Sequence, residues 1–226
     1  VSEDNPELIE GQTSRALFKY YKKHGYTIAQ KTEMIMANFL ENCRYQIDRK
    51  GKAMIVADSR ANAVRYYLAV KRYIEAHPDE CTGCDAMIAF SGEVTLEDYP
   101  SDKPFTEATM NLDEKGRYIT TDKMFRQAFH SNQYNILVVA NKYQTDEPLL
   151  HTMYVDKKLR DVTAVQTLSR LNRTCPGKSS TFVLDFENTE EDIRDAFLPY
   201  YETTILEGST DLNKVYDLRN KIRDYM

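Results

Sequence analysis

Short runs of consecutive hydrophobic residues alternate along this chain with longer segments whose hydrophobic residues recur every three or four positions. The short runs are typical of strands buried on both faces, and the longer spacing is typical of amphipathic helices. Five runs predict strands, at residues 52–59, 85–92, 134–142, 148–156 and 180–186. Helical spacing surrounds them, at residues 27–47, 61–77, 120–131, 162–173, 188–207 and 209–226. This order predicts an α/β fold with a parallel sheet, helices on both faces, and flanking N- and C-terminal helices.

Polar residues mark where several of these helices begin. Ser59 follows the first strand, and Thr121 or Asp122 opens a later helix, as expected of N-cap residues. Thr189 and Asp192 form a variant of the capping box that uses Asp in place of Glu or Gln. These signals place the helix starts independently of the hydrophobic spacing.

The pattern divides the chain into three parts. We expect a lead-in with one helix at residues 1–50, the α/β domain at 51–187, and the start of a helical region at 188–226. Residues 92–118 show no clear periodicity and predict a long loop or insertion. In a compact domain such a loop is more often functional or mobile than structural.

Composition limits the class of protein. The chain has 226 residues, a net charge of −5 and 42% hydrophobic residues, as expected of a soluble globular protein. It has no apolar run near the ~20 residues that span a membrane, and four cysteines make no disulfide framework. A cytoplasmic location is the simplest expectation. The start, without Met and polar, suggests a piece of a longer protein, and the acidic balance excludes nucleic-acid binding by bulk charge.

The sequence Gly177-Lys178-Ser179 invites comparison with a phosphate loop. That motif needs a second Gly five positions earlier, and the chain has Asn172 there. A helix precedes this segment and a strand follows it, which is the reverse of the order a phosphate loop requires. Gly177 is better interpreted as a helix C-terminal signal, with Pro176 preventing continuation of the helix.

Two arginines and a glutamine share one face of the predicted helix that precedes this glycine. Gln166, Arg170 and Arg173 are spaced i, i+4 and i+7. A solvated charged face explains the spacing by itself. On spacing alone the solvated face is favoured, and a face that binds phosphate is the alternative, because guanidinium forks match phosphate oxygens. We expect this helix to flank the carboxyl-terminal edge of the sheet with the three side chains unburied.

Other candidate sites are weaker. Cys81 and Cys84, with His77 just before them, have half of a zinc-site spacing, but no second pair follows, so we predict no metal site. His151 falls in a predicted strand and is interpreted as a packed core residue rather than a base.

Three segments together resemble a known family. VQTLSRLNRTCPGK (165–178) is similar to motif VI of superfamily 2 helicases and translocases, in the form found in the restriction (R) subunit of type I restriction-modification enzymes. YNILVVANKYQTDEPLLHTMYVDK (134–157) resembles that family's motif V region, and KAMIVADSRANAVRYY (52–67) its motif IV strand and helix. The resemblance runs in order over residues 27–220. It implies the second RecA-like domain of a DNA motor and the start of the helical region that follows.

The resemblance also implies roles for individual residues. In superfamily 2 motors ATP and Mg²⁺ lie between two RecA-like domains, and motif VI of the second domain reaches the terminal phosphates. Arg173 is then the expected arginine finger, Arg170 its companion, and Gln166 and Asp146 further residues of the ATP site. The first domain, which supplies the phosphate loop, is not in this chain, so we expect the chain alone not to hydrolyse ATP.

Motifs IV and V of the family follow the DNA backbone without reading its sequence. The candidates for this contact here are Ser59, Arg60, Ser91, Gly92, Lys142 and Thr145. The implied partners are DNA, the first RecA-like and nuclease domains of the same subunit, and the modification and specificity subunits. Two alternatives stay open: another superfamily 2 helicase or remodeller, and a non-enzymatic RecA-like interaction domain that binds an acidic partner through the arginine face.

Motif V departs from the family. Its usual form has Gly and Phe between the Thr and the Asp, whereas here Thr145 is followed directly by Asp146. Either motif V is shorter in this protein, which would alter its coupling of ATP to DNA, or two mobile residues are missing from the chain as written. We favour the second explanation.

Overall fold

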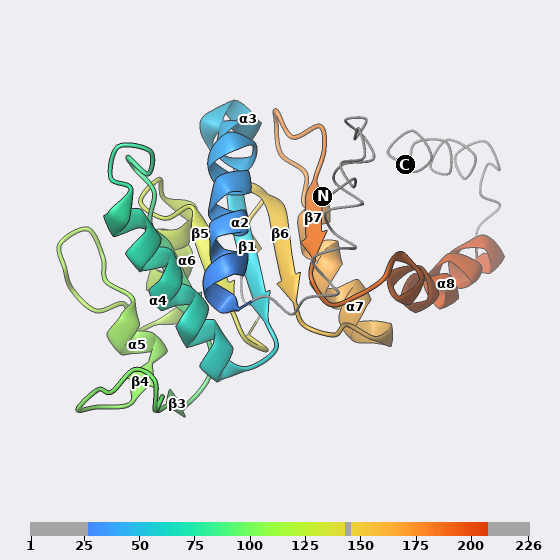
Figure 1. Ribbon diagram of the computed structural model, residues 1–226. Coiled ribbons are helices and arrows are strands. Elements are labelled where there is room, and N and C mark those ends of the chain that lie inside the picture. The colour runs from blue at the N-terminus through green and yellow to red at the C-terminus, as the bar shows by residue number, and fades with distance from the viewer. Residues whose placement is uncertain (1–26, 143–145, 208–226) are drawn as a thin grey trace, which may run out of the picture. The chain divides into compact units, whose positions relative to one another are not determined.

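A single parallel sheet organises the protein (Figure 1). The computed structural model describes residues 27–142 and 146–207. The five strands lie in the order β2-β5-β1-β6-β7, and each pairs in parallel with its neighbours. Their bounds are β1 (Lys52–Ala57), β2 (Ala86–Ala89), β5 (Ile136–Val139), β6 (Leu150–Asp156) and β7 (Phe182–Asp185). The predicted α/β fold with a parallel sheet is confirmed.

Helices connect the strands. They are α2 (Ile28–Glu41), α3 (Gln46–Arg49), α4 (Arg60–Ala76), α5 (Glu107–Met110), α6 (Asp122–His130), α7 (Asp161–Leu168) and α8 (Glu190–Glu207), with 3-10 turns at Cys43–Tyr45 and Ser169–Asn172. The predicted N-terminal lead-in before Thr27 and the predicted helix at 209–226 lie outside the described residues. None of the helices in the described ranges is long and apolar enough to cross a membrane.

The described chain forms two compact units. The first holds the sheet and comprises the described residues up to Lys158 together with Thr167–Asn188. The second comprises Leu159–Gln166 and the chain from Thr189 onward, which contains most of α7 and all of the described part of α8. The candidate motif VI therefore begins in one unit and ends in the other.

Strands β1, β2, β5 and β6 are buried on both faces, as the continuous hydrophobic runs predicted, whereas Phe182 and Val183 of the edge strand β7 are exposed. In β1, Ala53, Ile55 and Ala57 belong to the core that α2 and α4 cover, while Met54 and Val56 between them are equally inaccessible. Successive side chains of a strand point to opposite faces, so this pattern requires cover on both. Figure 1 shows α2 and α4 on one face and α6 on the other.

The predicted helix starts are confirmed by their caps. The side chain of Ser59 accepts a hydrogen bond from the backbone N–H of Asn62, and the side chain of Thr121 accepts one from Met124. Thr189 and Asp192 bond reciprocally, at 2.7 Å and 3.1 Å, and form the variant capping box. Each bond satisfies a backbone N–H that the first turn of a helix leaves without a partner.

The segment predicted as a long loop or insertion at 92–118 contains short regular elements. It contains an antiparallel pair, β3 (Glu93–Val94) and β4 (Phe105–Thr106), followed by α5. Asn111 is buried, and its side-chain amide accepts from the N–H of Ile88 and donates to the same residue's carbonyl, at 2.9 Å and 2.8 Å. The insertion thereby satisfies the outer edge of β2, an edge that would otherwise expose unpaired backbone groups.

Candidate functional site

The two segments that resemble motifs V and VI meet at the amino-terminal edge of the sheet. Asp146 precedes β6 and Arg173 precedes β7, so both lie where these parallel strands begin. Nε of Arg173 lies 2.6 Å from Oδ1 of Asp146, and the two side chains are 61% and 75% exposed. A cation and a carboxylate that are 27 positions apart in sequence thus form an accessible pair.

The helix geometry differs from the prediction in two respects. α7 ends at Leu168, a 3-10 turn holds Arg170, and Arg173 is extended, with φ −66° and ψ 123°. Regular i, i+4 and i+7 spacing along one helix is therefore wrong for Arg173. The predicted carboxyl-terminal edge is also wrong for both arginines, because the chain must return to the amino-terminal edge before a parallel strand can start.

Exposure differs among the three side chains of the predicted face. Arg173 is exposed, whereas Arg170 is half-buried, so the expectation that all three are unburied is only partly met. Gln166 is exposed in the second unit.

Gly177 and Lys178, which follow Arg173, shape and stabilise the loop between the 3-10 turn and β7. Nζ of Lys178 donates to the carbonyls of Pro148, Leu171 and Arg173, at 3.2 Å, 2.7 Å and 2.8 Å. Gly177 has φ +82°, which a residue with a side chain rarely adopts. Lys178 therefore fixes the loop that presents Arg173. The interpretation of Gly177 as a helix C-terminal signal is wrong, because the helical turn ends at Asn172 with Arg173 as its C-cap, and Gly177 belongs to a separate turn closed by the N–H of Lys178 on the carbonyl of Cys175.

A small cavity borders the ion pair. It has a volume of about 150 Å³ and is lined by Arg126, Phe129, His130, Asp146 and Glu147. Nδ1 of His130 lies 3.0 Å from Oε2 of Glu147, whose side chain is almost fully buried. Sequence reasoning missed these neighbours. The only available signal was the i, i+4 spacing of Arg126 and His130 on α6, and that spacing is common on solvated helices.

The residues proposed to follow DNA lie mostly at the opposite, carboxyl-terminal edge. Ser59 and Arg60 follow β1, and Ser91 and Gly92 follow β2. Nη1 of Arg60 donates to the carbonyl of Ser91 at 3.0 Å. A Cβ on Gly92 would come within 2.8 Å of that Nη1, and Gly92 has φ +81°. The glycine therefore permits the arginine to cross between the two loops.

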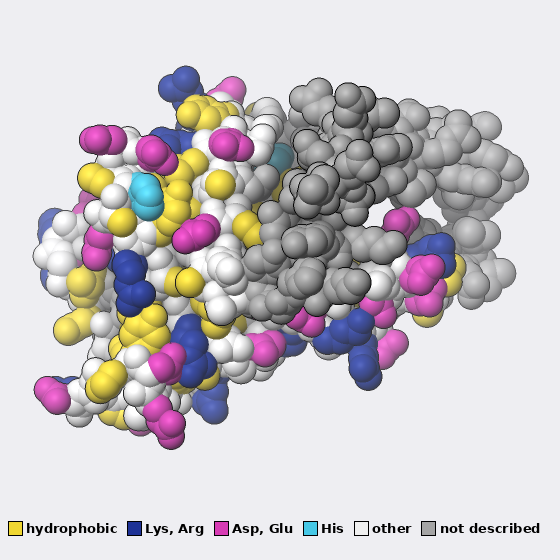
Figure 2. All heavy atoms as spheres, in the orientation of Figure 1, with side chains coloured by type: hydrophobic (Ala, Val, Ile, Leu, Met, Phe, Trp, Pro, Cys, Tyr) yellow, Lys and Arg dark blue, Asp and Glu magenta, His cyan; other side chains and the backbone are white. Residues whose placement is uncertain are grey.

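Lys142 lies after β5 at the same edge but has protein partners. Its Nζ lies 2.7 Å and 2.9 Å from the two carboxylate oxygens of Glu107 and 3.7 Å from Asp122. Thr145, the remaining candidate, lies outside the described residues. The structure does not describe residues 143–145, so the two explanations for the short form of motif V stay predictions. On the face formed by α2 and α4, Figure 2 shows acidic and basic side chains interspersed.

His77, Cys81 and Cys84 are not part of a group of side chains that could hold a metal ion in the described residues. Nδ1 of His77 bonds the carbonyl of Tyr73, and burial raises the pKa of the Cys84 thiol. Within the two described ranges, no group of three His, Cys, Asp or Glu side chains could hold a metal ion. His151 is buried in β6 with Nδ1 bonded to Thr152, which confirms its interpretation as a core residue.

Comparison with known proteins points to one family. Residues 96–188 match the family model of domain 3 of the type I restriction enzyme subunit R. A putative type I restriction enzyme MjaVIIP endonuclease subunit of Methanocaldococcus jannaschii is 27% identical over 203 residues, which cover 81% of this chain and 18% of that protein. The chain therefore spans about a fifth of the relative's length.

Two solved helicase structures are also similar. The helicase domain of Pyrococcus furiosus Hef matches 85% of this chain and 32% of its own length, with 12% identity and a TM-score of 0.40. Saccharomyces cerevisiae Dbp5, bound to Gle1 and IP6, matches 87% of this chain and 43% of its own length, with 11% identity and a TM-score of 0.42. The matches in sequence confirm that this chain resembles the R subunit of type I restriction enzymes.

Proposed function

We propose that this chain is the second motor domain of a type I restriction enzyme R subunit and supplies Arg173 to an ATP site shared with a first RecA-like domain. The observation that supports this most is the exposed pair of Arg173 and Asp146. It joins the segments that resemble motifs V and VI on one accessible edge. A residue that serves another domain must be both fixed and accessible, and the three bonds of Lys178 to nearby carbonyls hold this loop.

The chemistry of the pair suits a nucleotide. A guanidinium group matches phosphate oxygens, and Asp146 is an oxyanion that already lies beside Nε of Arg173. A terminal phosphate can take the place of that carboxylate, because both are anions that accept from the same fork. Arg173, with Arg170 nearby in the 3-10 turn, would then stabilise charge that develops on the transferred phosphoryl group.

ATP with Mg²⁺ would supply the energy for movement. The described residues offer Mg²⁺ no cluster of three ligands, so we assign most of its coordination to the first domain. Gln166 would complete motif VI. The isolated chain would bind nucleotide with only part of a site and should not hydrolyse it.

DNA would be followed at the carboxyl-terminal edge. Arg60 donates to the carbonyl of Ser91 there, next to Gly92. Contacts from such loops to phosphates carry no sequence information. Ser59, Lys142 and Thr145 are proposed to belong to the same surface. The nuclease domain of the subunit and the modification and specificity subunits are the proposed partners of the complete enzyme, which would act in the cytoplasm.

The test is DNA-stimulated ATP hydrolysis by the complete R subunit that contains this chain. We expect Arg173→Ala to lower turnover by about 10³–10⁵-fold, the usual contribution of an arginine finger, with DNA binding unchanged. Arg117→Ala is the matched control, because Arg117 is 68% exposed and lies 2.7 Å from Asp113, much as Arg173 lies beside Asp146. It should retain normal turnover. Turnover within about twofold of wild type in Arg173→Ala would overturn the proposal and favour a partner-binding role.

A further inference from the structure

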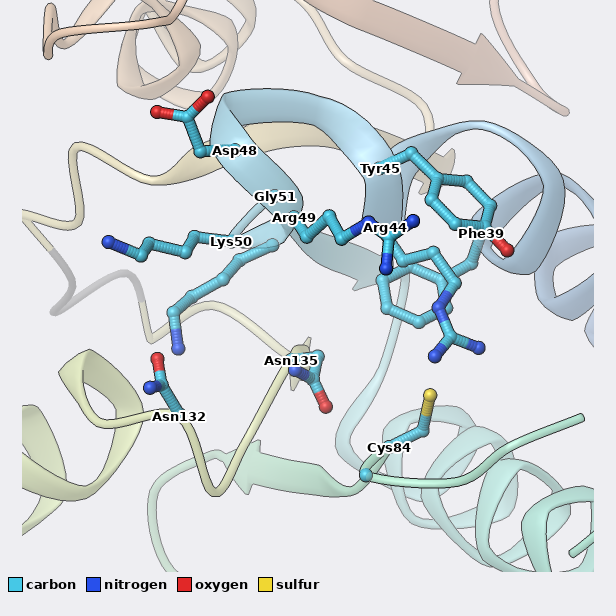
Figure 3. Close-up of a pocket in the computed structure, with 12 residues that line it drawn as sticks. Phe39, Arg44, Tyr45, Asp48, Arg49, Lys50, Gly51, Cys84, Asn132 and Asn135 are labelled. Atoms are coloured by element: carbon cyan, nitrogen blue, oxygen red, sulfur yellow. The ribbon is translucent and has the colours of Figure 1, made fainter. Parts of the chain in front are cut away.

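A basic pocket lies elsewhere on the amino-terminal edge of the sheet (Figure 3). It contains none of the residues proposed for the ATP site or for the DNA contact. Its volume is about 360 Å³, within the range of small-molecule sites. The segment between α2 and β1 forms much of its wall, through Arg44, Tyr45, Arg49 and Lys50. Figure 3 shows Asn132 and Asn135 on the opposite side, from the connection between α6 and β5.

An unusual backbone shapes this wall. Ile47, Asp48 and Arg49 have φ of 51°, 54° and 65°, the left-handed region that residues with side chains seldom adopt. Gly51 closes the turn against the carbonyl of Cys43, which a Cβ would approach to 2.1 Å. Successive strained residues persist only where the surroundings enforce them, and they concentrate at binding sites.

The pocket concentrates positive charge in an acidic chain. Its lining has four cationic side chains and one carboxylate, that of Asp48, whereas the whole chain has a net charge of −5. Arg49 and Lys50 are exposed and make no ion pair with any other described residue. Cations gathered in a concave site raise the local concentration of an anionic ligand.

An aromatic ring stands beside these cations. Tyr45 is 53% exposed, and the guanidinium carbons of Arg44 and Arg49 lie 5.7 Å and 5.6 Å from its ring centroid. Arg44 is held in place because its two terminal nitrogens donate to the carbonyls of Glu80 and Thr82. A flat exposed ring next to cations is the arrangement on which nucleobases stack while their phosphates are neutralised.

The opposite side offers hydrogen-bonding groups. Asn135 accepts from the N–H of Asp85 through Oδ1, which leaves its Nδ2 for a ligand, and Asn132 is exposed. Amide side chains can bond the donor and acceptor edges of a base. The ring of Tyr45, the cationic side chains and the two amides thus line the same pocket.

We propose that this pocket binds a nucleotide unit, with its phosphate on Arg49 and Lys50 and its base against Tyr45. The unit could belong to a free nucleotide or to a single nucleic-acid strand, which share this chemistry. The site is independent of the proposed shared ATP site and of the DNA contact at the carboxyl-terminal edge.

The test measures binding to the 226-residue chain by fluorescence anisotropy of a labelled oligo(dT) of about 12 nucleotides, a length within the usual range of single-strand sites. We expect Tyr45→Ala to weaken binding about fivefold or more and Tyr45→Phe to retain it, because only the ring is needed for stacking. The double variant Arg49→Gln with Lys50→Gln should lower the magnitude of the slope of log K, where K is the binding constant, against log salt concentration by about 1–2.

Arg72→Gln is the matched control, since Arg72 is exposed and lies 5.6 Å from the ring of Tyr99. Competition by AMP or dTMP at concentrations near that of the oligonucleotide would identify a free nucleotide as the ligand, and its failure would identify a strand. The proposal is overturned if the chain does not bind the probe, if the pocket variants bind like wild type, or if polyglutamate competes equally well. Loss of binding in Arg60→Ala alone would also overturn it, while leaving the proposed motor function intact.

Discussion

The strongest prediction about stability concerns the buried ammonium group at the start of β1. Lys52 is 2% exposed, and its Nζ donates to the carbonyls of Phe129, Ser131 and Tyr134, at 2.5 Å, 2.7 Å and 2.6 Å. The same nitrogen lies 4.9 Å from the ring centroid of Phe129. One side chain therefore ties the central strand to the connection between α6 and β5.

The expected cost of replacing Lys52 follows from these contacts. Hydrogen bonds that involve a charged group contribute about 1.5–3 kcal/mol each. Burial opposes them, and it lowers the pKa of Lys52 to about 8. Lys52→Met keeps the volume and removes this desolvation cost, but it leaves three carbonyls without their donor, two of them in buried bonds. We expect a net loss of about 3–5 kcal/mol, a large part of the ~5–15 kcal/mol stability of a typical domain.

Urea unfolding at pH 7 measures this loss. With a slope of about 2–3 kcal/mol per molar urea, the midpoint should fall by about 1–2 M. Lys50→Met is the control, because Lys50 is two positions away, exposed and not ion-paired with another described residue, and its change should stay within about 0.5 kcal/mol. A loss below about 1 kcal/mol in Lys52→Met, at unchanged slope, would refute the reasoning that the three carbonyls depend on this ammonium group.

Three further predictions test other parts of the structure. In urea unfolding, Gly92→Ala should lose more stability than Gly116→Ala. Both glycines have positive φ, but of the two only Gly92 has a neighbour that an added Cβ would meet, Nη1 of Arg60 at 2.8 Å. Equal losses of stability in the two variants would contradict this reasoning. Burial lowers the pKa of His151, so the unfolded state binds more protons near pH 6.5 and below, and stability falls as pH drops from 7 to 5. The loss of stability between pH 7 and pH 5 should be smaller in His151→Leu than in the wild type. The same dependence of stability on pH in both proteins would refute the prediction. Burial raises the pKa of the Cys43 thiol to about 12, so iodoacetamide at pH 8 should label it only after unfolding, as mass spectrometry would show.

The hydrophobic pattern predicted most of the fold because four of the five strands of the parallel sheet, β1, β2, β5 and β6, are buried along their whole length. Continuous hydrophobic runs such as residues 53–57 are unfavourable in solvent. Such runs are usually found in parallel sheets whose two faces are both covered by helices. The caps at Ser59, Thr121 and Thr189 are local interactions within one helical turn, which is why the sequence shows them directly. The insertion at 92–118 was harder to predict, because Asn111 satisfies an edge that is more than 20 positions away in sequence.

The candidate site was predicted by residue type rather than by position. The motif VI resemblance indicated Arg173, and the motif V resemblance indicated Asp146, but their contact and its place at the amino-terminal edge came only from the structure. Helical spacing misplaced Arg173 because the chain leaves the helix after Leu168. The neighbouring His130 and Glu147 were not foreseen, since their contact depends on how α6 meets the loop before β6.

By itself, the sequence determined the order of strands and helices, the parallel class of the sheet and the family that the chain resembles. These depend on the spacing of hydrophobic residues and on short motifs, which act over a few neighbouring positions. Only the tertiary structure decided which loops share an edge, that Lys52 and Lys178 are bound by carbonyls while Arg49 and Lys50 remain exposed, and that a basic pocket forms beside Tyr45. Charged side chains look alike in a sequence, and their roles differ because the folded backbone supplies acceptors to some of them and leaves others facing solvent.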